Sequence, residues 1–198
     1  MNDTILFHAT LMPDDDWWHA LWPDPKSVLQ QVGIKPGMQV VDLCCGNGHF
    51  TQPMTELVEN GHVYGLDLDE PLLAQAKEIC RSATNFTPIL ADAMNLPNEI
   101  DAAVDFVFIA NTFHGAQNQT DLSRAVLQSL KPGGRFSVVN WHHRPREETP
   151  VLGLPRGPAK ELRMTPDEVR KSVEPSGLKF EKVVDVGPYH YAINFVKE

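Results

Sequence analysis

The 198-residue sequence has no long apolar run and comparatively few basic residues. No stretch approaches the roughly 20 apolar residues of a membrane-spanning helix, and the first residues lack the basic and apolar regions of a signal peptide. The chain has 17 Lys and Arg against 26 Asp and Glu, a formal net charge of -9. A general nucleic-acid-binding protein needs a clustered basic surface, which this sequence does not have. We therefore expect a cytoplasmic protein that acts on a small molecule, without a nucleic-acid or membrane partner.

Cysteine is scarce as well, and the three that are present are Cys44, Cys45 and Cys80. An odd number that includes an adjacent pair does not suit an ordinary set of disulfides and fits a reducing compartment. Adjacent side chains on a strand point in opposite directions, so Cys44 and Cys45 are not expected to face one substrate together. We interpret the cysteines as packing residues, with a thiolate site for a soft metalloid as the alternative, and we predict no metal site.

A third glycine is missing from the most informative stretch of the chain. Residues 39–43 have the β-branched apolar character of a buried parallel strand, and Gly46 and Gly48 then allow the backbone to approach a ligand closely. The dinucleotide fingerprint G-x-G-x-x-G would place glycine or alanine where this chain has Thr51. Asp42, before the turn, would repel a pyrophosphate but suits a cationic ligand. A nucleotide-dependent oxidoreductase is therefore disfavoured and is kept as an alternative.

Acidic residues follow the next two predicted strands. The strand at residues 62–67 ends in Asp67, about 20 residues after the glycine turn, where nucleotide-binding sheets hold a ribose through its hydroxyl groups. Asp92 and Ala93 follow the next apolar segment. Asp67 is consequently the best single candidate for a ribose-binding residue.

In this order and spacing, the motifs resemble the class I S-adenosylmethionine-dependent methyltransferases, and in particular the small group related to ubiquinone and menaquinone biosynthesis methyltransferases. The resemblance covers roughly residues 36–197. In that family an acid precedes three alternating glycines, and Cys44 stands here in place of the first glycine. A side chain is tolerated at this position where the backbone keeps an ordinary φ. Residues 104–110 resemble the fourth strand of the family, and residues 130–136 resemble the turn before its fifth.

The resemblance implies S-adenosylmethionine as the cofactor and methyl transfer to a small-molecule acceptor as the activity. Asp42 would favour the methionine ammonium group, Asp67 would accept hydrogen bonds from the ribose hydroxyls, and Asp92 would accept one from the adenine amino group. A non-catalytic module that binds S-adenosylmethionine is the alternative. The cofactor-binding residues implied are Asp42, Cys44, Gly46, Gly48, Asp67, Leu68, Asp92, Ala93, Asn111 and Thr112.

Three histidines are candidates for a general base, which methyl transfer needs only when the acceptor starts protonated. His114, after the fourth strand, is our first choice, with a hydrogen-bonded edge histidine as the alternative. His142 and His143 follow the fifth strand, and only one of these neighbours could face a pocket because adjacent side chains on an extended chain point opposite ways.

Two further segments carry side chains that could contact the acceptor. Trp17, Trp18 and Trp22 either pack an N-terminal helix onto the domain or form an aromatic lid that holds the sulfonium by cation–π contact. Residues 142–159 are rich in proline and predict a loop that covers part of the molecule. Four basic residues in and after this loop either attract an anionic substrate or form a solvated loop surface. They are Arg144, Arg146, Arg156 and Arg163.

Strand and helix patterns alternate from residue 39 to about 141, which predicts an α/β fold: a Rossmann-like doubly wound sheet of about seven strands, mainly parallel. Residues 180–186 and 189–196 predict an antiparallel C-terminal hairpin, typical of a methyltransferase sheet and absent from an all-parallel dinucleotide-binding sheet. Asp69, Asp121 and Thr165 are predicted to cap helices. We expect one domain (36–198) preceded by a helical lid segment (1–35), as a monomer or homodimer.

Overall fold

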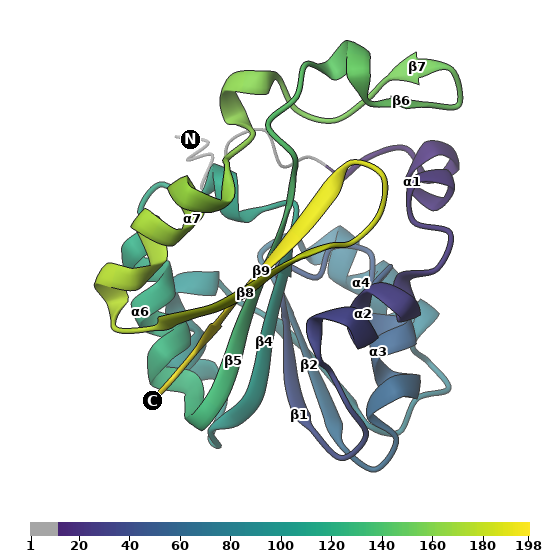
Figure 1. Cartoon of the computed structure of the whole chain (residues 1–198). Helices are drawn as coiled ribbons and strands as arrows, with labels where there is room; N and C mark the ends of the chain where they lie inside the picture. Colours follow the sequence, from purple (N-terminus) through teal and green to yellow (C-terminus); the bar gives the residue numbers. More distant parts are fainter. Residues whose placement is uncertain (1–11) are drawn as a thin grey trace, which may run out of the picture.

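The computed structural model describes residues 12–198, so the first part of the predicted lid segment lies outside the described residues. A seven-stranded sheet with the strand order β3-β2-β1-β4-β5-β9-β8 forms the centre of the molecule (Figure 1). Its strands are β1 (Gln39–Leu43), β2 (His62–Asp67), β3 (Phe86–Leu90), β4 (Val104–Ala110), β5 (Leu130–Trp141), β8 (Lys179–Asp185) and β9 (His190–Val196). A separate ribbon pairs β6 (Pro150–Val151) with β7 (Leu154–Pro155). The predicted α/β fold is confirmed.

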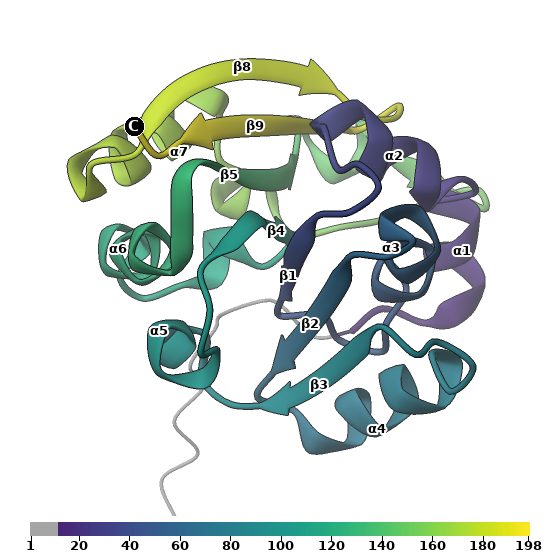
Figure 2. The ribbon, with the colours of Figure 1, turned by 90° about the horizontal axis from the view of Figure 1, so that it is seen from below.

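Helices lie on both faces of this sheet (Figure 2). They are α1 (Asp15–Leu21), α2 (Pro25–Val32), α3 (Thr51–Val58), α4 (Glu70–Ile79), α5 (Leu96–Glu99), α6 (Gln119–Ser129) and α7 (Pro166–Val173). A hydrophobic core lies on each face of the sheet. Alternate residues of a strand contribute to the two cores, because side chains on a strand point to opposite faces. Val40 and Phe106 pack in the core with α2 and α3, whereas Val41 and Val107 pack in the core with α5, α6 and α7.

The two C-terminal strands give the sheet its antiparallel edge. Strands β1 to β5 pair in parallel, whereas β9 lies antiparallel between β5 and β8. Gly187 and Pro188 connect β8 to β9, and the φ of Gly187 is +122°, a value that suits glycine in a tight connection. The predicted C-terminal hairpin is therefore confirmed, and the sheet is not of the all-parallel dinucleotide-binding kind.

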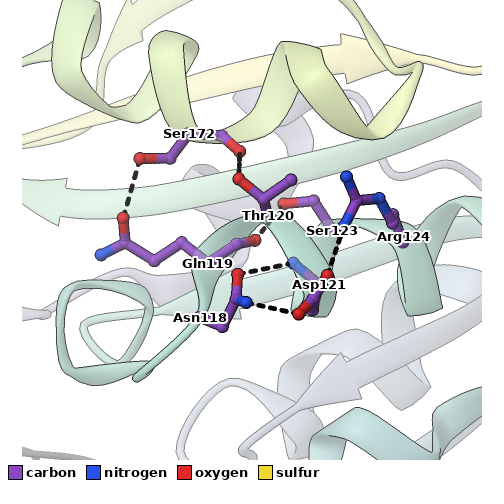
Figure 3. Close-up of polar contacts among 7 residues, drawn as sticks. All are labelled: Asn118, Gln119, Thr120, Asp121, Ser123, Arg124 and Ser172. Carbon is purple, nitrogen blue, oxygen red and sulfur yellow. Dashed lines mark hydrogen bonds and ion pairs between the residues drawn. The ribbon is translucent and has the colours of Figure 1, made fainter.

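The predicted cap of α6 is wrong by one turn. Asn118, not Asp121, is the N-cap: its backbone is extended, and its side-chain oxygen accepts a hydrogen bond from the backbone N–H of Asp121 at 3.0 Å (Figure 3). The carboxylate of Asp121 instead contacts the side chains of Asn118 and Arg124. Both residue types cap helices, so residue type alone does not distinguish them. The predicted caps Asp69 and Thr165 are confirmed.

Helix α6 is joined to α7 through Ser172 (Figure 3). The Ser172 hydroxyl donates to the side-chain oxygen of Gln119 at 2.8 Å, and the Thr120 hydroxyl donates to the Ser172 carbonyl at 2.8 Å. These bonds fix the position of α7. The segment 142–165, which precedes α7, consists of short turns and β6–β7, as its prolines predict.

Helix α1 and the segment 142–165 both lie beyond the carboxyl ends of the parallel strands (Figure 1). They come from distant parts of the sequence and meet where α1 packs beside β6. Together they cover the edge of the sheet at which open α/β proteins bind ligands. Among residues 12–198, no helix is long and apolar enough to cross a membrane.

Candidate functional site

A cavity of about 540 Å³ lies at the carboxyl ends of the parallel strands. Asp42, Asp67, Ala110 and Trp141 contribute the strand ends, while α1 and the segment 142–165 form the facing wall. The sheet order reverses between β1 and β4, the position at which such sheets bind their ligands. Ligand pockets usually measure about 300–1,000 Å³, so this cavity has room for a small molecule.

The turn after β1 is built from residues in the left-handed conformation. Gly46 and Gly48 have φ values of +55° and +90°, and a Cβ at Gly48 would lie only 2.9 Å from the Cα of Ala76 on α4. Cys44 is also left-handed, with a φ of +60°. Cys44 therefore does not keep the ordinary φ at which a side chain is readily tolerated, and it adopts a left-handed conformation that favours glycine.

Cys44 and Cys45 both line the cavity. Cys44 packs against the core with α5, α6 and α7, whereas the Cys45 sulfur lies beside Gly65 and Phe86, next to the other core. That the two thiols do not face one substrate together stays a prediction. Burial raises the pKa of the Cys44 thiol well above its ordinary value and that of Cys80 to about 11, and the nearby charge of Asp42 acts in the same direction. Thiols held in the protonated form are poor metal ligands, which supports the packing interpretation.

Asp67 ties this turn to the end of β2. One carboxylate oxygen accepts a hydrogen bond from the Gly46 N–H at 2.7 Å, and the other accepts one from the Asp69 N–H at 2.9 Å. The Cys45 N–H donates to the Leu66 carbonyl at 3.1 Å. Each carboxylate oxygen has two lone pairs, so Asp67 keeps acceptor capacity toward the cavity that it lines.

Asp42 is a buried acid covered by the first residue of α3. Its side chain is 3% exposed and accepts a hydrogen bond from the Thr51 hydroxyl at 2.6 Å. Burial raises the pKa of Asp42 to about 7, against the lowering effect of the Thr51 bond. Thr51, which stands where the dinucleotide fingerprint has glycine, therefore has a role in the site. A buried acid of this kind is stabilised in its charged form by a cation placed beside it.

The end of β4 brings Asn111, Thr112 and His114 to the cavity. Asn111 has a left-handed φ of +59°, and its N–H donates to the Val139 carbonyl at 2.9 Å. Both polar atoms of its side chain are buried and have no hydrogen-bond partner among the described residues. The Thr112 hydroxyl donates to the Ala110 carbonyl at 3.1 Å. The amide of Asn111 is thus the polar group of this edge that is free for a ligand.

Four of the implied cofactor residues do not line the cavity, namely Gly48, Leu68, Asp92 and Ala93. Asp92 begins a short 3₁₀ turn, where its carboxylate accepts a hydrogen bond from the Met94 N–H at 2.9 Å. Ala93 packs in the core beneath that turn, and Leu68 is exposed at the end of β2. The adenine-binding role of Asp92 and Ala93 stays a prediction.

The tryptophans of the N-terminal segment are buried. Their contacts differ: two line the cavity, and one packs against the domain. Trp17 and Trp18 line the cavity. Trp22 packs with its ring 4.3 Å from that of His190, which lies 4.1 Å from the ring of Trp141 on β5. Trp22 therefore anchors α1 to the domain, and the other two rings form an aromatic wall of the cavity.

His49 lines the cavity although the sequence did not single it out. Its ring lies 6.0 Å from that of Trp18 and 5.0 Å from that of His19. Burial lowers the pKa of His49 to about 4, and nearby His19 acts in the same direction. The atom Nε2 is buried and has no hydrogen-bond partner among the described residues. A neutral imidazole of this kind can accept a proton, and only its place beside Gly48 could have drawn attention to it.

His142 and His143 do not line this cavity. His142 forms an ion pair at 3.2 Å with Asp185 when protonated, and Nδ1 of His143 lies 2.5 Å from the Arg163 carbonyl. Both interactions are structural. Of the four arginines, Arg146 and Arg156 line the cavity, whereas Arg163 is buried beside it.

Comparison with known proteins agrees with this geometry. Residues 40–134 match a protein family described as a methyltransferase domain. Over 117 residues the chain is 33% identical to demethylmenaquinone methyltransferase of Staphylococcus aureus (strain MRSA252), and the alignment covers 59% of this chain and 47% of that protein. The chain spans about half the length of the curated relatives that it matches.

Solved structures share the whole fold. A SAM dependent methyltransferase from Aquifex aeolicus superposes with a TM-score of 0.79 at 27% identity, covering 93% of this chain and 95% of that one. The [4+2]-cyclase SpnF shares the fold with a TM-score of 0.69 at 16% identity, covering 87% and 80%. Residues 40–134 thus match a methyltransferase domain, and the fold is that of S-adenosylmethionine-dependent methyltransferases.

The cofactor of this class, S-adenosylmethionine, fits the chemistry of the cavity. Asp42 offers a buried acid to a cationic group, and Asp67 offers free acceptor capacity. Buried side-chain atoms of Asn47, Asn111 and His49 have no partner among the described residues. A polar ligand bound in the cavity would supply the hydrogen-bond partners that these atoms lack.

The left-handed Cys44 predicts a difference between two substitutions. Cys44→Gly should leave the protein more stable than Cys44→Ala by about 1 kcal/mol, because glycine adopts a positive φ without the steric cost of a Cβ. Both variants remove the same thiol, so their difference isolates the backbone effect. Urea unfolding of the pair measures it, and equal free energies of unfolding would contradict a left-handed conformation at this position.

The raised pKa of Asp42 predicts a pH-dependent cost to stability. Because its folded-state pKa lies above the unfolded value of 3.8, the stability contributed by Asp42 is full below pH 3.8 and is lost as the pH rises to about 7. Asp42→Asn removes this dependence, so its stability relative to the wild type should increase by up to about 3 kcal/mol between pH 5 and pH 8. Urea unfolding at both pH values tests this, and a pH-independent difference would be the contrary result.

Proposed function

We propose that the protein transfers the methyl group of S-adenosylmethionine to a small-molecule acceptor bound in the same cavity. The observation that carries the proposal is the continuity of one cavity, which extends from the acidic strand ends Asp42 and Asp67 to the aromatic and basic side chains of α1 and the segment 142–165. The acidic part suits the cationic and hydroxyl groups of the cofactor. The aromatic part gives an acceptor its own surface.

On the cofactor side, the residues of the chain bind and orient. When bound, S-adenosylmethionine supplies an electrophilic methyl group on a sulfonium centre. Asp42 would stabilise the methionine ammonium group, Asp67 would accept hydrogen bonds from the ribose hydroxyls, and the free amide of Asn111 would bind the polar part of the methionine. Asp92 would accept a hydrogen bond from the adenine amino group outside the described cavity.

On the acceptor side, the chain aligns the nucleophile and excludes water. Trp17 and Trp18 cover the cavity from α1, which removes solvent from the reacting groups. Alignment alone accounts for much of the rate of a direct displacement. For a hydroxyl or amine acceptor, His114 at the end of β4 would take the proton, and the neutral His49 is a second imidazole in the same cavity.

The acceptor is one that a small cavity can hold. Relatives named demethylmenaquinone methyltransferase make a quinone precursor one candidate. We expect the reaction to take place in the cytoplasm, in a monomer or homodimer.

Two alternatives are less well supported. A non-catalytic module for S-adenosylmethionine would need no acceptor space, yet the cavity continues past the acidic strand ends to Trp17 and Arg156. A nucleotide-dependent oxidoreductase would need room for a pyrophosphate beside the glycine turn. Asp42 lies there under Thr51, and its negative charge opposes phosphate binding.

Substitution of Asp67 tests the cofactor site. Asp67→Ala should weaken the binding of S-adenosylhomocysteine at least about tenfold, because charge-assisted hydrogen bonds to the ribose are lost. Isothermal titration measures the affinity, with the exposed Asp101→Ala as the matched control. Methyl-donor turnover across thiols, phenols, amines and quinone precursors should fall in parallel. Unchanged affinity, or tight binding of NAD instead, would overturn the assignment.

The two cavity histidines predict different pH profiles with a phenol acceptor. If His114 is the base, His114→Ala should lower kcat by about 100-fold and abolish the rise of kcat with pH, whereas His49→Ala should keep that rise. If His49 is the base, the wild-type rate should already be level above about pH 5, given its pKa of about 4. Identical profiles for His114→Ala and the wild type would remove His114 from the mechanism.

A further inference from the structure

Two arginines bring positive charge to the cavity from the segment 142–165. Arg146 and Arg156 are the Lys or Arg side chains that line it in the described part of the chain. The chain as a whole has a net charge of -9, so two basic side chains at one cavity contrast with its acidic composition. The acids next to Arg146, Glu147 and Glu148, are exposed and do not line the cavity. Arg144 is exposed and does not line it either.

A buried hydrogen-bond network holds the backbone of both arginines. Thr149, which is fully buried, places its hydroxyl 3.1 Å from the Arg146 carbonyl and 3.0 Å from the Arg156 carbonyl, to which it can donate. The same hydroxyl accepts a hydrogen bond from Arg163 at 3.0 Å. Arg163 also donates to the carbonyls of Arg156 at 2.9 Å and Pro158 at 3.0 Å. The loop is therefore fixed without use of the two cavity guanidinium groups.

Arg163 has a structural role, which separates it from the other two. It is 2% exposed and lies with its guanidinium carbon 4.8 Å from the centre of the Trp141 ring. Burial lowers its pKa, and the charge of Arg146 acts in the same direction. A buried cation is tolerated only when it is hydrogen-bonded, and Nε and one terminal nitrogen of Arg163 make such bonds, while the other terminal nitrogen has no partner among the described residues. Arg163 thus holds the loop in place through its hydrogen bonds, while Arg156 presents its side chain to the cavity.

The side chain of Arg156 is placed to receive an anion. Its guanidinium carbon lies 5.1 Å from the centre of the Trp17 ring. Its Nε is buried and has no hydrogen-bond partner among residues 12–198, and no carboxylate of those residues forms an ion pair with it. A guanidinium presents several N–H donors in a planar fork that matches carboxylate and phosphate oxygens. An unmatched buried donor of this group in a cavity indicates a ligand oxygen.

We propose that Arg156, assisted by Arg146, binds an anionic oxygen group of the methyl acceptor, so that the acceptor is a small carboxylate or phosphate with an apolar body. That body would lie against the rings of Trp17, Trp18 and Trp141, which line the same cavity. This inference rests on the proposed function, because it names the class of acceptor for that site. It distinguishes this chain's acceptor from a neutral quinone.

Binding of matched probes to the full chain saturated with S-adenosylhomocysteine tests the inference. The probes are 4-hydroxybenzoate, 4-hydroxyphenyl phosphate and the neutral 4-hydroxybenzamide, measured by isothermal titration. The wild type should bind at least one anion about tenfold or more tightly than the amide, since charged hydrogen bonds are worth about one order of magnitude in affinity. Comparison of the two anions tells carboxylate from phosphate.

Substitutions in the segment 142–165 show which side chains produce the preference for the anionic probes. Arg156→Ala should abolish the preference for the anion, Arg156→Lys should retain part of it, and Arg146→Ala should reduce it. Arg144→Ala, from the same loop but outside the cavity, should leave it unchanged. Thermal unfolding and the affinity for S-adenosylhomocysteine confirm that each variant is folded. Equal binding of anion and amide by the wild type, no binding of either anion, or an intact preference in Arg156→Ala would overturn the inference.

Failure of this inference and failure of the proposed function give different results. Methyl transfer to a neutral quinone precursor that is unaffected by Arg156→Ala would overturn the anionic acceptor and leave the methyltransferase function in place. An anion preference that depends on Arg156, without methyl transfer to any acceptor, would support the anion site and count against the function.

Discussion

The hydrogen bond from the Gly46 N–H to the carboxylate of Asp67 joins the turn after β1 to the end of β2, and the geometry of the site depends on it. The bond requires the chain to bend sharply after Leu43, which the left-handed Cys44 and Gly46 achieve. That bend starts α3 at Thr51, whose hydroxyl then covers Asp42. Both acids thus face a single cavity, Asp42 as a buried acid suited to a cation and Asp67 as a part-exposed acid suited to hydroxyl groups.

The sheet could be predicted from the sequence because it depends on local patterns. Apolar strand patterns, glycine turns and the Gly187-Pro188 connection indicate the strands without reference to distant contacts. The conformation of Cys44 could not be predicted in this way, because cysteine gives no local signal for a left-handed φ. The steric cost of this left-handed φ is offset by the contacts that fix the ends of β1 and β2. The position of the α6 cap could not be predicted for a related reason: Asn118 and Asp121 are equally good caps by residue type, and the structure uses Asn118.

The same distinction between local patterns and distant contacts applies to the site. Residues at strand ends, such as Asp67 and Asn111, could be predicted, since the carboxyl ends of parallel strands meet at one edge of a sheet. The cover of the cavity could not. His190 packs between Trp22 and Trp141, and Arg163 lies on the Trp141 ring, so elements from the two ends of the chain and its middle are held together by contacts that no local pattern reports. The four arginines looked alike in the sequence, yet one supports the loop and two face the cavity.

The most direct test of this account is a crystal structure of the chain with S-adenosylhomocysteine. We expect the ribose hydroxyls within hydrogen-bond distance of Asp67, the amino-acid end beside the glycine turn and Asp42, and the space between Trp17 and Arg156 left for an acceptor. Binding of the ligand outside the cavity, or with its ribose away from Asp67, would contradict the central claim that the turn after β1 builds the cofactor site.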